Sequence, residues 1–171
     1  MFPPVGYYAA KLRPDDMIWF RIDNRLIHGQ IIETWLPYTR ATRLVVCNAD
    51  LAHDPLRQQI MILAVPARIK VEFTEPAALN CLLHGQNGQE REERVLVIFA
   101  DCSDAKTSYS LGVRFTKLNI GNMHYAPGKR QICGHVAFSE EDSICLRAFA
   151  DVGVTLDFRC VPNDTTEVTE W

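Results

Sequence analysis

The chain has 171 residues, of which 47% are hydrophobic and 23% are charged, and its formal net charge at pH 7 is −3. This length and balance predict one soluble globular domain with a sizeable core. The charge excludes a global basic field, so nucleic acid is not an expected partner, and the longest uncharged apolar stretches are far too short to span a membrane.

At the start of the chain, Lys11 and Arg13 follow the apolar part of residues 1–16, an order that is not typical of a signal peptide. We expect residues 1–16 to be a poorly ordered extension and residues 17–171 to form a single domain. Short β-type runs then alternate with helical patterns, which predicts an α/β domain with a largely parallel sheet. The predicted strands are Ile18–Ile22, Arg43–Asn48, Ile69–Phe73, Val95–Ala100, Lys117–Ile120 and Val154–Arg159, with a further short strand near His135–Ala137.

The predicted helices lie between these strands, at Gly29–Tyr38, Asp54–Ala64, Pro76–His84, Asp104–Leu111 and Glu140–Asp151. In the second of them, Ile60, Leu63 and Ala64 share one face, and a proline suits the first turn. Before the last helix, Ser139 is a predicted N-cap, and the acids that follow it complement the helix dipole. Gly153 stands where a C′ glycine ends a helix.

Six cysteines are spread along the chain without a C-x-x-C pair or a Cys/His knuckle. We therefore expect neither a zinc site nor a thioredoxin-like redox site. Several of them, such as Cys47 and Cys160, lie inside apolar runs. This placement favours buried, reduced thiols in a cytosolic protein.

The densest chemistry of the chain follows the first predicted strand, in the segment Asp23–Gln30. In a doubly wound sheet, ligands bind at the carboxyl ends of the strands. The imidazole of His28 is both a nucleophile and a good leaving group near neutral pH, as a phosphoryl carrier requires. The guanidinium of Arg25 has the fork that stabilises the oxygens of a phosphoryl group without a metal.

The neighbouring residues fit the same chemistry but also have simpler explanations. A helix that begins at or just after His28 would add backbone N–H donors, and Gly29 would let the backbone approach a phosphate. Asp23 either orients Arg25 or holds one imidazole nitrogen, and the sequence leaves both roles open. Equally, the histidine could be a loop or capping residue, the arginine a surface ion-pair partner and the glycine a helix start.

The exact string Arg21–Gln30 resembles the phosphorylation-site signature of the mannose/fructose/sorbose family of EIIB components, which belong to the phosphoenolpyruvate-dependent sugar phosphotransferase system. Trp35 then follows in the first helix, where the family has its tryptophan. Two further blocks, Asn48–Arg57 and Leu118–Lys129, are similar to the family in the same order. The resemblance covers about residues 17–162, and three blocks in order are far more specific than a lone glycine motif.

The resemblance implies a doubly wound α/β domain with a mostly parallel, seven-stranded sheet and helices on both faces. It implies that His28 is the phosphohistidine, linked through Nδ1, that Arg25 holds the phosphate, and that Asp23 supports the loop. The further residues that would bind phosphate or support the loop are Asn24, Gly29, Gln30 and Lys129. Asn24 departs from the Asp or Ser that many members carry.

The resemblance also implies the partners and the reaction. A phosphorylated EIIA would transfer phosphate to His28, and the chain would pass it to a sugar bound in a membrane permease of EIIC and EIID subunits. The activity would be that of a protein-N(pi)-phosphohistidine–sugar phosphotransferase. No metal or other cofactor is expected, because histidine and arginine do the work of magnesium in a kinase. The chain would be cytoplasmic and would associate with the inner face of the membrane through its permease.

Two other functions stay open at this point. A regulatory protein of the same fold would also be phosphorylated on His28 but would feed no permease. A small-molecule or nucleotide-binding module would never form phosphohistidine, and neither a G-x-G-x-x-G nor a Walker sequence supports it. His124 lacks an Arg-x-x-His arrangement around it, so we do not expect a second phosphorylation site there.

Overall fold

The computed structural model describes residues 18–84, 93–165 and 168. The expected extension, residues 1–16, lies outside the described residues, so the domain boundary stays a prediction. The strands are β1 Ile18–Asp23, β2 Arg43–Cys47, β3 Lys70–Thr74, β4 Val95–Phe99, β5 Lys117–Asn122, β6 Arg130–Cys133, β7 Val136–Phe138 and β8 Thr155–Asp157. The helices are η1 Ile31–Trp35, α1 Leu36–Thr39, α2 Ala49–Ala52, α3 Pro55–Ile62, α4 Pro76–His84, α5 Cys102–Ser110 and α6 Glu140–Asp151.

Six strands form one parallel sheet in the order β3-β2-β4-β1-β5-β8, which confirms the predicted α/β fold. The main sheet has six strands rather than the implied seven. The strand predicted near His135–Ala137 is β7, which pairs with β6 in an antiparallel hairpin and touches the end of β5 through a bridge between Met123 and Val136. Two short elements, β6 and α2, were not predicted.

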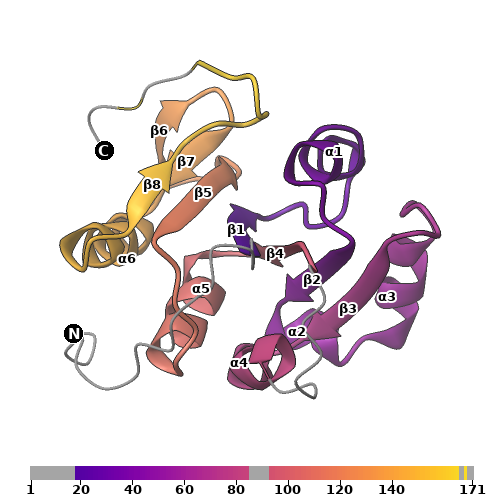
Figure 1. Cartoon of the computed structure of the whole chain (residues 1–171). Helices are drawn as coiled ribbons and strands as arrows, with labels where there is room; N and C mark the ends of the chain where they lie inside the picture. The colour runs from indigo at the N-terminus through magenta and orange to yellow at the C-terminus, as the bar shows by residue number, and fades with distance from the viewer. Residues whose placement is uncertain (1–17, 85–92, 166–167, 169–171) are drawn as a thin grey trace.

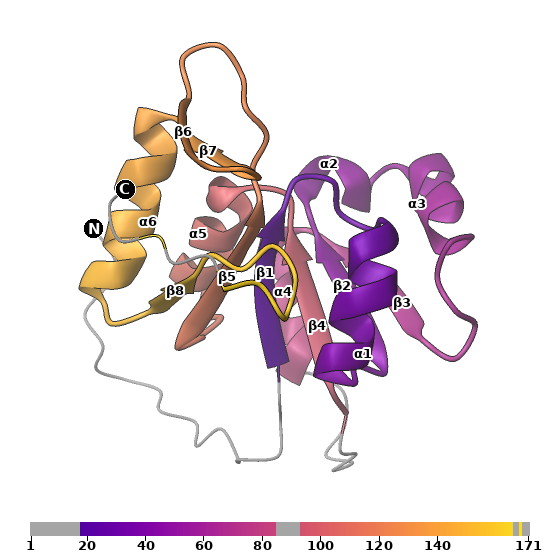
Figure 2. The ribbon, with the colours of Figure 1, turned by 90° about the horizontal axis from the view of Figure 1, so that it is seen from above.

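Helices cover both faces of the main sheet, α1, α2 and α3 on one side and α4, α5 and α6 on the other (Figures 1 and 2). The strand side chains alternate between the two cores: in β4, Leu96 and Ile98 pack on the α1 side, whereas Val97 and Phe99 pack on the α5 side. Because both faces are covered, β2 and β4 are buried along their whole length, as is typical of parallel sheets.

The helix after β1 and the last helix follow the prediction closely. The first runs over residues 29–39, and its middle is the π-helical segment η1, where the N–H of Leu36 donates to the carbonyl of Ile31. Such π segments occur often at functional sites. At α6, Ser139 forms a capping box with Asp142, and Gly153 has a φ of +88° just beyond the helix end.

Helix α3 differs from the expected amphipathic helix. Asp54 caps it by accepting a hydrogen bond from the N–H of Arg57, and Pro55 occupies the first turn as predicted. None of its residues is buried, however, and Ile60 and the C-cap residue Leu63 are 59% and 86% exposed. Its predicted apolar face stays outside the core because α3 packs chiefly against α2. No helix in the described part of the chain is long and apolar enough to cross a membrane.

Candidate functional site

Strand β1 carries two charged side chains into the interior of the protein. Phe20 and Ile22 face the α5 side of the sheet, so Arg21 and Asp23 face the α1 side, and both are fully buried. β1 lies between β4 and β5, and the helices that follow β1 and β4 cover opposite faces. This is the switch point at which a doubly wound sheet binds its ligands.

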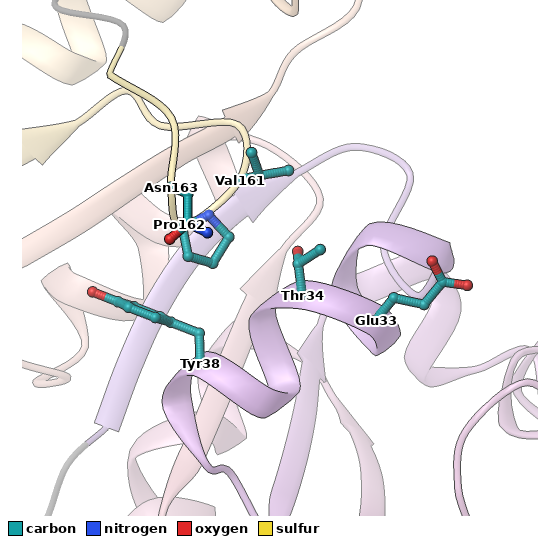
Figure 3. Close-up of a pocket in the computed structure, with 6 residues that line it drawn as sticks. All are labelled: Glu33, Thr34, Tyr38, Val161, Pro162 and Asn163. Atoms are coloured by element: carbon teal, nitrogen blue, oxygen red, sulfur yellow. The ribbon is translucent and has the colours of Figure 1, made fainter.

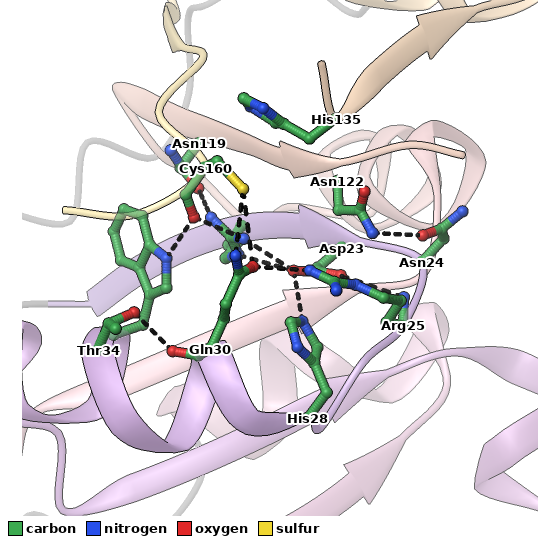
Figure 4. Close-up of polar contacts among 12 residues, drawn as sticks. Asp23, Asn24, Arg25, His28, Gln30, Thr34, Asn119, Asn122, His135 and Cys160 are labelled. Carbon is green, nitrogen blue, oxygen red and sulfur yellow. Dashed lines mark hydrogen bonds and ion pairs between the residues drawn. The ribbon is translucent and has the colours of Figure 1, made fainter. Parts of the chain in front are cut away.

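Asp23, at the end of β1, holds the loop together (Figure 4). Its Oδ2 accepts a hydrogen bond from Arg21 Nη2 at 2.8 Å and lies 2.9 Å from His28 Nε2. Its Oδ1 accepts from the backbone N–H of Arg25 at 3.1 Å. Burial by itself would raise the pKa of Asp23, but the hydrogen bond from His28 and the charge of Arg21 outweigh burial and lower this pKa. Asp23 is therefore a carboxylate at neutral pH.

The turn between Asp23 and His28 depends on Leu26. The N–H of Leu26 donates to the carbonyl of Asp23 at 2.9 Å, and the φ of Leu26 is +57°. A left-handed conformation costs a residue with a Cβ about 1–2 kcal/mol. The side chains of Leu26 and the adjacent Ile27 are buried in the α1-side core, and this burial offsets the strain. The turn sends His28 back towards the carboxylate.

His28 has one anchored ring nitrogen and one that is open. Its side chain is 17% accessible, and Nε2 faces the carboxylate of Asp23. An imidazole in this position carries its proton on Nε2 and its lone pair on Nδ1. Within the described part of the chain, the hydrogen bonds of the ring engage Nε2 and not Nδ1. The lone pair of Nδ1 is thus available to a nucleophilic reaction.

Arg25 points to the same side of the loop as His28 (Figure 4). Its Nε lies 3.7 Å from Asp23 Oδ1, and its Nη2 donates to Gln30 Oε1 at 2.7 Å. The side chain is 36% accessible, so the guanidinium remains open to an incoming anion. Gln30 in turn donates to Cys160 Sγ at 3.5 Å, which ties the arginine to the C-terminal segment.

Asn24 connects the loop to β5. Its N–H donates to the carbonyl of Asn122 at 3.1 Å, and its Oδ1 accepts from Asn122 Nδ2 at 3.2 Å. With its amide turned the other way, Asn122 presents its oxygen to Arg25 Nε at 2.7 Å. Asn24 and Asn122 therefore support the loop, and Asn122 can also position the guanidinium.

Gly29 opens the helix of residues 29–39. A Cβ added to Gly29 would meet nothing within 4 Å, so packing within the described chain does not require glycine there. The first N–H groups of a helix have no partner within the helix and are suited to bind an anion. Open space therefore lies beside the first turn of this helix, next to the residue that carries the imidazole.

Lys129 is not brought to this cluster. Its Nζ pairs with Asp142 Oδ2 at 3.0 Å, in the first turn of α6. The sequence block that contains Lys129 does reach the site, but through Asn122 at the end of β5. A contribution of Lys129 to phosphate binding stays a prediction that this ion pair does not support.

The sequence pattern alone did not single out Arg21 or Gly121 as site residues. A Cβ on Gly121 would lie 1.7 Å from Cζ of Arg21, so the guanidinium fits because position 121 is glycine. The available signal was the two-residue alternation of β1, which places Arg21 on the same face as Asp23. The local pattern of β1 could not predict its contact with β5, because the residues of one strand do not show which distant strand will pair with it.

A pocket of about 380 Å³ opens one helical turn beyond Gln30, between the first helix and the C-terminal segment (Figure 3). It is lined by Glu33, Thr34, Tyr38, Val161, Pro162 and Asn163. Thr34 Oγ1 donates to the carbonyl of Gln30 at 2.6 Å, so the pocket adjoins the loop but does not include His28.

A second buried carboxylate lies near the carboxyl ends of β2 and β4. Asp104, in the first turn of α5, is only 8% exposed and accepts a hydrogen bond from Asn48 Nδ2 at 2.9 Å. Burial, reinforced by the charges of Asp101 and Asp50, raises the pKa of Asp104 to about 6. Ionisation of Asp104 is therefore less favourable in the folded protein than in the unfolded chain.

Replacing Asp104 with asparagine is expected to stabilise the fold at pH 8 by about 1–2 kcal/mol. The pKa of Asp104 is about 6 in the folded chain and 3.8 as the reference value, so folding takes up a proton between these values. The ionised carboxylate costs stability above pH 6, and the cost is largely lost near pH 4. Chemical denaturation at pH 8 and pH 4 measures the free energy of unfolding of Asp104→Asn and of the parent. An equal difference between the two proteins at both pH values would contradict a raised pKa of Asp104.

Comparison with known proteins identifies the family. The model described as the PTS system sorbose subfamily IIB component matches residues 17–170. The chain belongs to this family. The sorbose-specific EIIB component of Klebsiella pneumoniae is 35% identical over 84% of this chain and 87% of its own length. The fructose-specific EIIB component of Bacillus subtilis is 29% identical over 89% of this chain and 92% of its own.

Solved structures agree with this EIIB assignment. The IIBSor domain of the sorbose permease from Klebsiella pneumoniae superposes with a TM-score of 0.80 at 33% identity, covering 89% of this chain and 93% of that one. An N-acetylgalactosamine IIB component from Streptococcus pyogenes has a TM-score of 0.81 at 26% identity, covering 90% and 93%. The family predicted from the Arg21–Gln30 signature and the two later blocks is confirmed.

Proposed function

We propose that this EIIB chain is a phosphoryl carrier that accepts phosphate on Nδ1 of His28 and donates it to a sugar during uptake. One observation carries the proposal: Asp23 engages Nε2 of a partly exposed imidazole and so leaves Nδ1 to react, while its other oxygen lies 3.7 Å from Nε of the partly exposed Arg25. A histidine so held is a nucleophile before transfer and a leaving group after it.

In the proposed reaction, the Nδ1 lone pair attacks the phosphorus of phosphorylated EIIA, and the bond from phosphorus to the donor breaks. Nε2 keeps its proton throughout and donates it in a hydrogen bond to Asp23. The positive charge on the phosphorylated ring is therefore matched by a fixed carboxylate. Arg25 stabilises the oxygens of the moving group, and the N–H groups at Gly29 and Gln30 add donors. In the second transfer, a sugar hydroxyl oxygen attacks the phosphorus, the P–N bond breaks with its electron pair returning to Nδ1, and the hydroxyl proton passes to water.

The partners follow from the same role. EIIA supplies the phosphate, and a permease of EIIC and EIID subunits presents the sugar, so the chain works in the cytoplasm at the inner face of the membrane. A mannose-specific EIIAB component from Escherichia coli is 28% identical over 91% of this chain and 49% of its own length, and its name joins an EIIA to an EIIB. The activity is that of a protein-N(pi)-phosphohistidine–sugar phosphotransferase. Arg25 is the phosphate-binding cation, and Lys129 is left out because it is paired with Asp142.

Incubation with phosphoenolpyruvate, the general phosphotransferase proteins and EIIA is expected to add one phosphoryl group. Mass spectrometry at alkaline pH, which preserves the acid-labile P–N bond, should locate it on His28, and nitrogen NMR should assign it to Nδ1. The sorbose-specific EIIB of Klebsiella pneumoniae with its own EIIA serves as the positive control. Label on another residue, or no label while the control is phosphorylated, would refute the proposal.

A further inference from the structure

The guanidinium of Arg21 is fully buried, and all of its donors are used. Nε and Nη2 donate to Asp23 Oδ2 at 3.2 and 2.8 Å, and Nη2 also donates to the carbonyl of Cys160 at 3.2 Å. Nη1 donates to Asn119 Oδ1 and to the carbonyl of Arg159, the latter at 3.4 Å. Because a guanidinium has five N–H groups, these five hydrogen bonds saturate it.

The fold builds a slot for this side chain. On one side, the guanidinium lies 4.7 Å from the centre of the Trp35 ring, and Trp35 Nε1 donates to the same Cys160 carbonyl at 3.0 Å. On the other side is Gly121, where a Cβ would lie 1.7 Å from Arg21 Cζ. The pairing of β1 with β5 shifts register beside this glycine. Arg21 is thus held in one position by backbone and aromatic groups.

A buried arginine without a free donor cannot bind a phosphate at His28, but it controls the charge of Asp23. A buried carboxylate without a cation either takes up a proton or repels an incoming phosphate. The charge of Arg21 cancels that of Asp23 inside the protein. Arg25 is then the cation of the loop that faces solvent and is not fully compensated.

We propose that Arg21 is a positioning residue for phosphoryl transfer, an inference that rests on the proposed role of His28. Arg21 keeps Asp23 ionised and aimed at Nε2, so that His28 presents Nδ1 while the carboxylate does not repel the phosphate. The carbonyl groups of Arg159 and Cys160 hold Arg21 in place, so the C-terminal segment is part of the phosphoryl-transfer site although it contributes no group to the phosphate.

The test compares Arg21→Met, which removes the charge at similar length, with Arg21→Lys, which keeps it. Nitrogen NMR of the unphosphorylated protein reports which ring nitrogen of His28 carries the proton. We expect the parent and Arg21→Lys to hold it on Nε2, and Arg21→Met to lose this preference. Phosphate uptake by Arg21→Met should slow by about 10- to 100-fold, the range of losses seen when a group that orients a metal-binding histidine is removed. An unchanged tautomer and rate in Arg21→Met would overturn the proposal.

Arg43, the first residue of β2, is a matched control two strands away from β1 in the sheet. It is also a buried strand arginine, pairs with Glu72, and donates to the carbonyl of Leu82 at 3.1 Å. Arg43→Met is expected to lower stability without moving the His28 tautomer. If Arg43→Met changed the His28 tautomer as much as Arg21→Met, the tautomer change would reflect a general loss of fold stability. The specific role proposed for Arg21 would then be wrong.

A double variant shows whether Arg21 acts through Asp23. Added to Asp23→Asn, Arg21→Met should cause no further loss in tautomer preference or rate, whereas additive losses would overturn the proposal. If Arg21→Met does not fold, Arg21→Lys decides: a retained preference for Nε2–H supports the proposal, and its loss in a folded protein refutes it. The tautomer is measured without phosphate, so a chain that accepts no label would refute the proposed function independently of this result.

Discussion

Replacing His28 with alanine is expected to abolish phosphate uptake while leaving the fold intact. The imidazole is the one group of the loop that combines an unprotonated nucleophile with exposure to a docking protein. Asp23 is fully buried and engaged, and Arg25 is a cation. Removing the ring leaves the buried pair of Arg21 and Asp23 in place, so the melting temperature of His28→Ala should stay close to that of the parent.

The measurement is incorporation of phosphate from phosphoenolpyruvate through EIIA, followed over time and checked by mass spectrometry. His53→Ala is a suitable control, because His53 is exposed and its Nδ1 contacts the carbonyl of Ala49 at 3.0 Å, away from the loop. The control should be labelled at the rate of the parent. Phosphate that still entered His28→Ala, whether on His124 or elsewhere, would contradict the assignment.

Replacing Arg25 with alanine is expected to slow transfer by about 10²- to 10³-fold, the usual effect of removing a donor that stabilises a transition-state oxyanion. The guanidinium is held by Gln30 and Asp23 on the side of His28, with over a third of its side chain accessible. Arg25→Lys should recover part of the rate, because it restores the charge but not the planar fork. Rapid-quench measurements at saturating EIIA separate this effect from weaker docking.

Comparing Lys129→Ala with Arg25→Ala shows which of the two cations stabilises the phosphoryl group during transfer. Because Lys129 is paired with Asp142 and does not touch the loop, we expect its removal to change the transfer rate by no more than about twofold. A loss as large as that of Arg25→Ala would show that the ion pair opens during transfer and would restore the role expected from the sequence. A parent-like rate in Arg25→Ala would make Arg25 a bystander.

The elements predicted correctly are those with strong local signals. Buried runs such as Val95–Phe99 and the capped helix at Glu140–Asp151 are specified by their own residues, through burial on both faces and through a capping box. The four-residue elements α2 and β6 have too few residues for a periodic pattern, and they went unnoticed. In α3, the apolar residues are periodic, but what they contact depends on where the helix lies.

In the candidate site, too, some features follow from local sequence and others depend on tertiary contacts. Asp23, Arg25 and His28 lie within six consecutive residues, so a strand end followed by a tight turn necessarily brings them near each other, and the sequence alone was enough to group them. It could not choose between the two roles of Asp23. The structure shows that the carboxylate does both, with one oxygen on His28 and the other on the backbone of Arg25.

The tertiary structure alone decided how the arginine beside that carboxylate is held. Three of the five hydrogen bonds of Arg21 go to groups that lie about 100 to 140 positions further along the chain, in β5 and in the C-terminal segment. Local pattern carries no information on such contacts, because they depend on which strands become neighbours and in which register. Lys129 illustrates the converse: its position in a matching block suggested the site, yet the folded chain pairs it with Asp142. Local residue chemistry thus specified the proposed reacting group, and the pairing of distant segments specified its electrostatic environment.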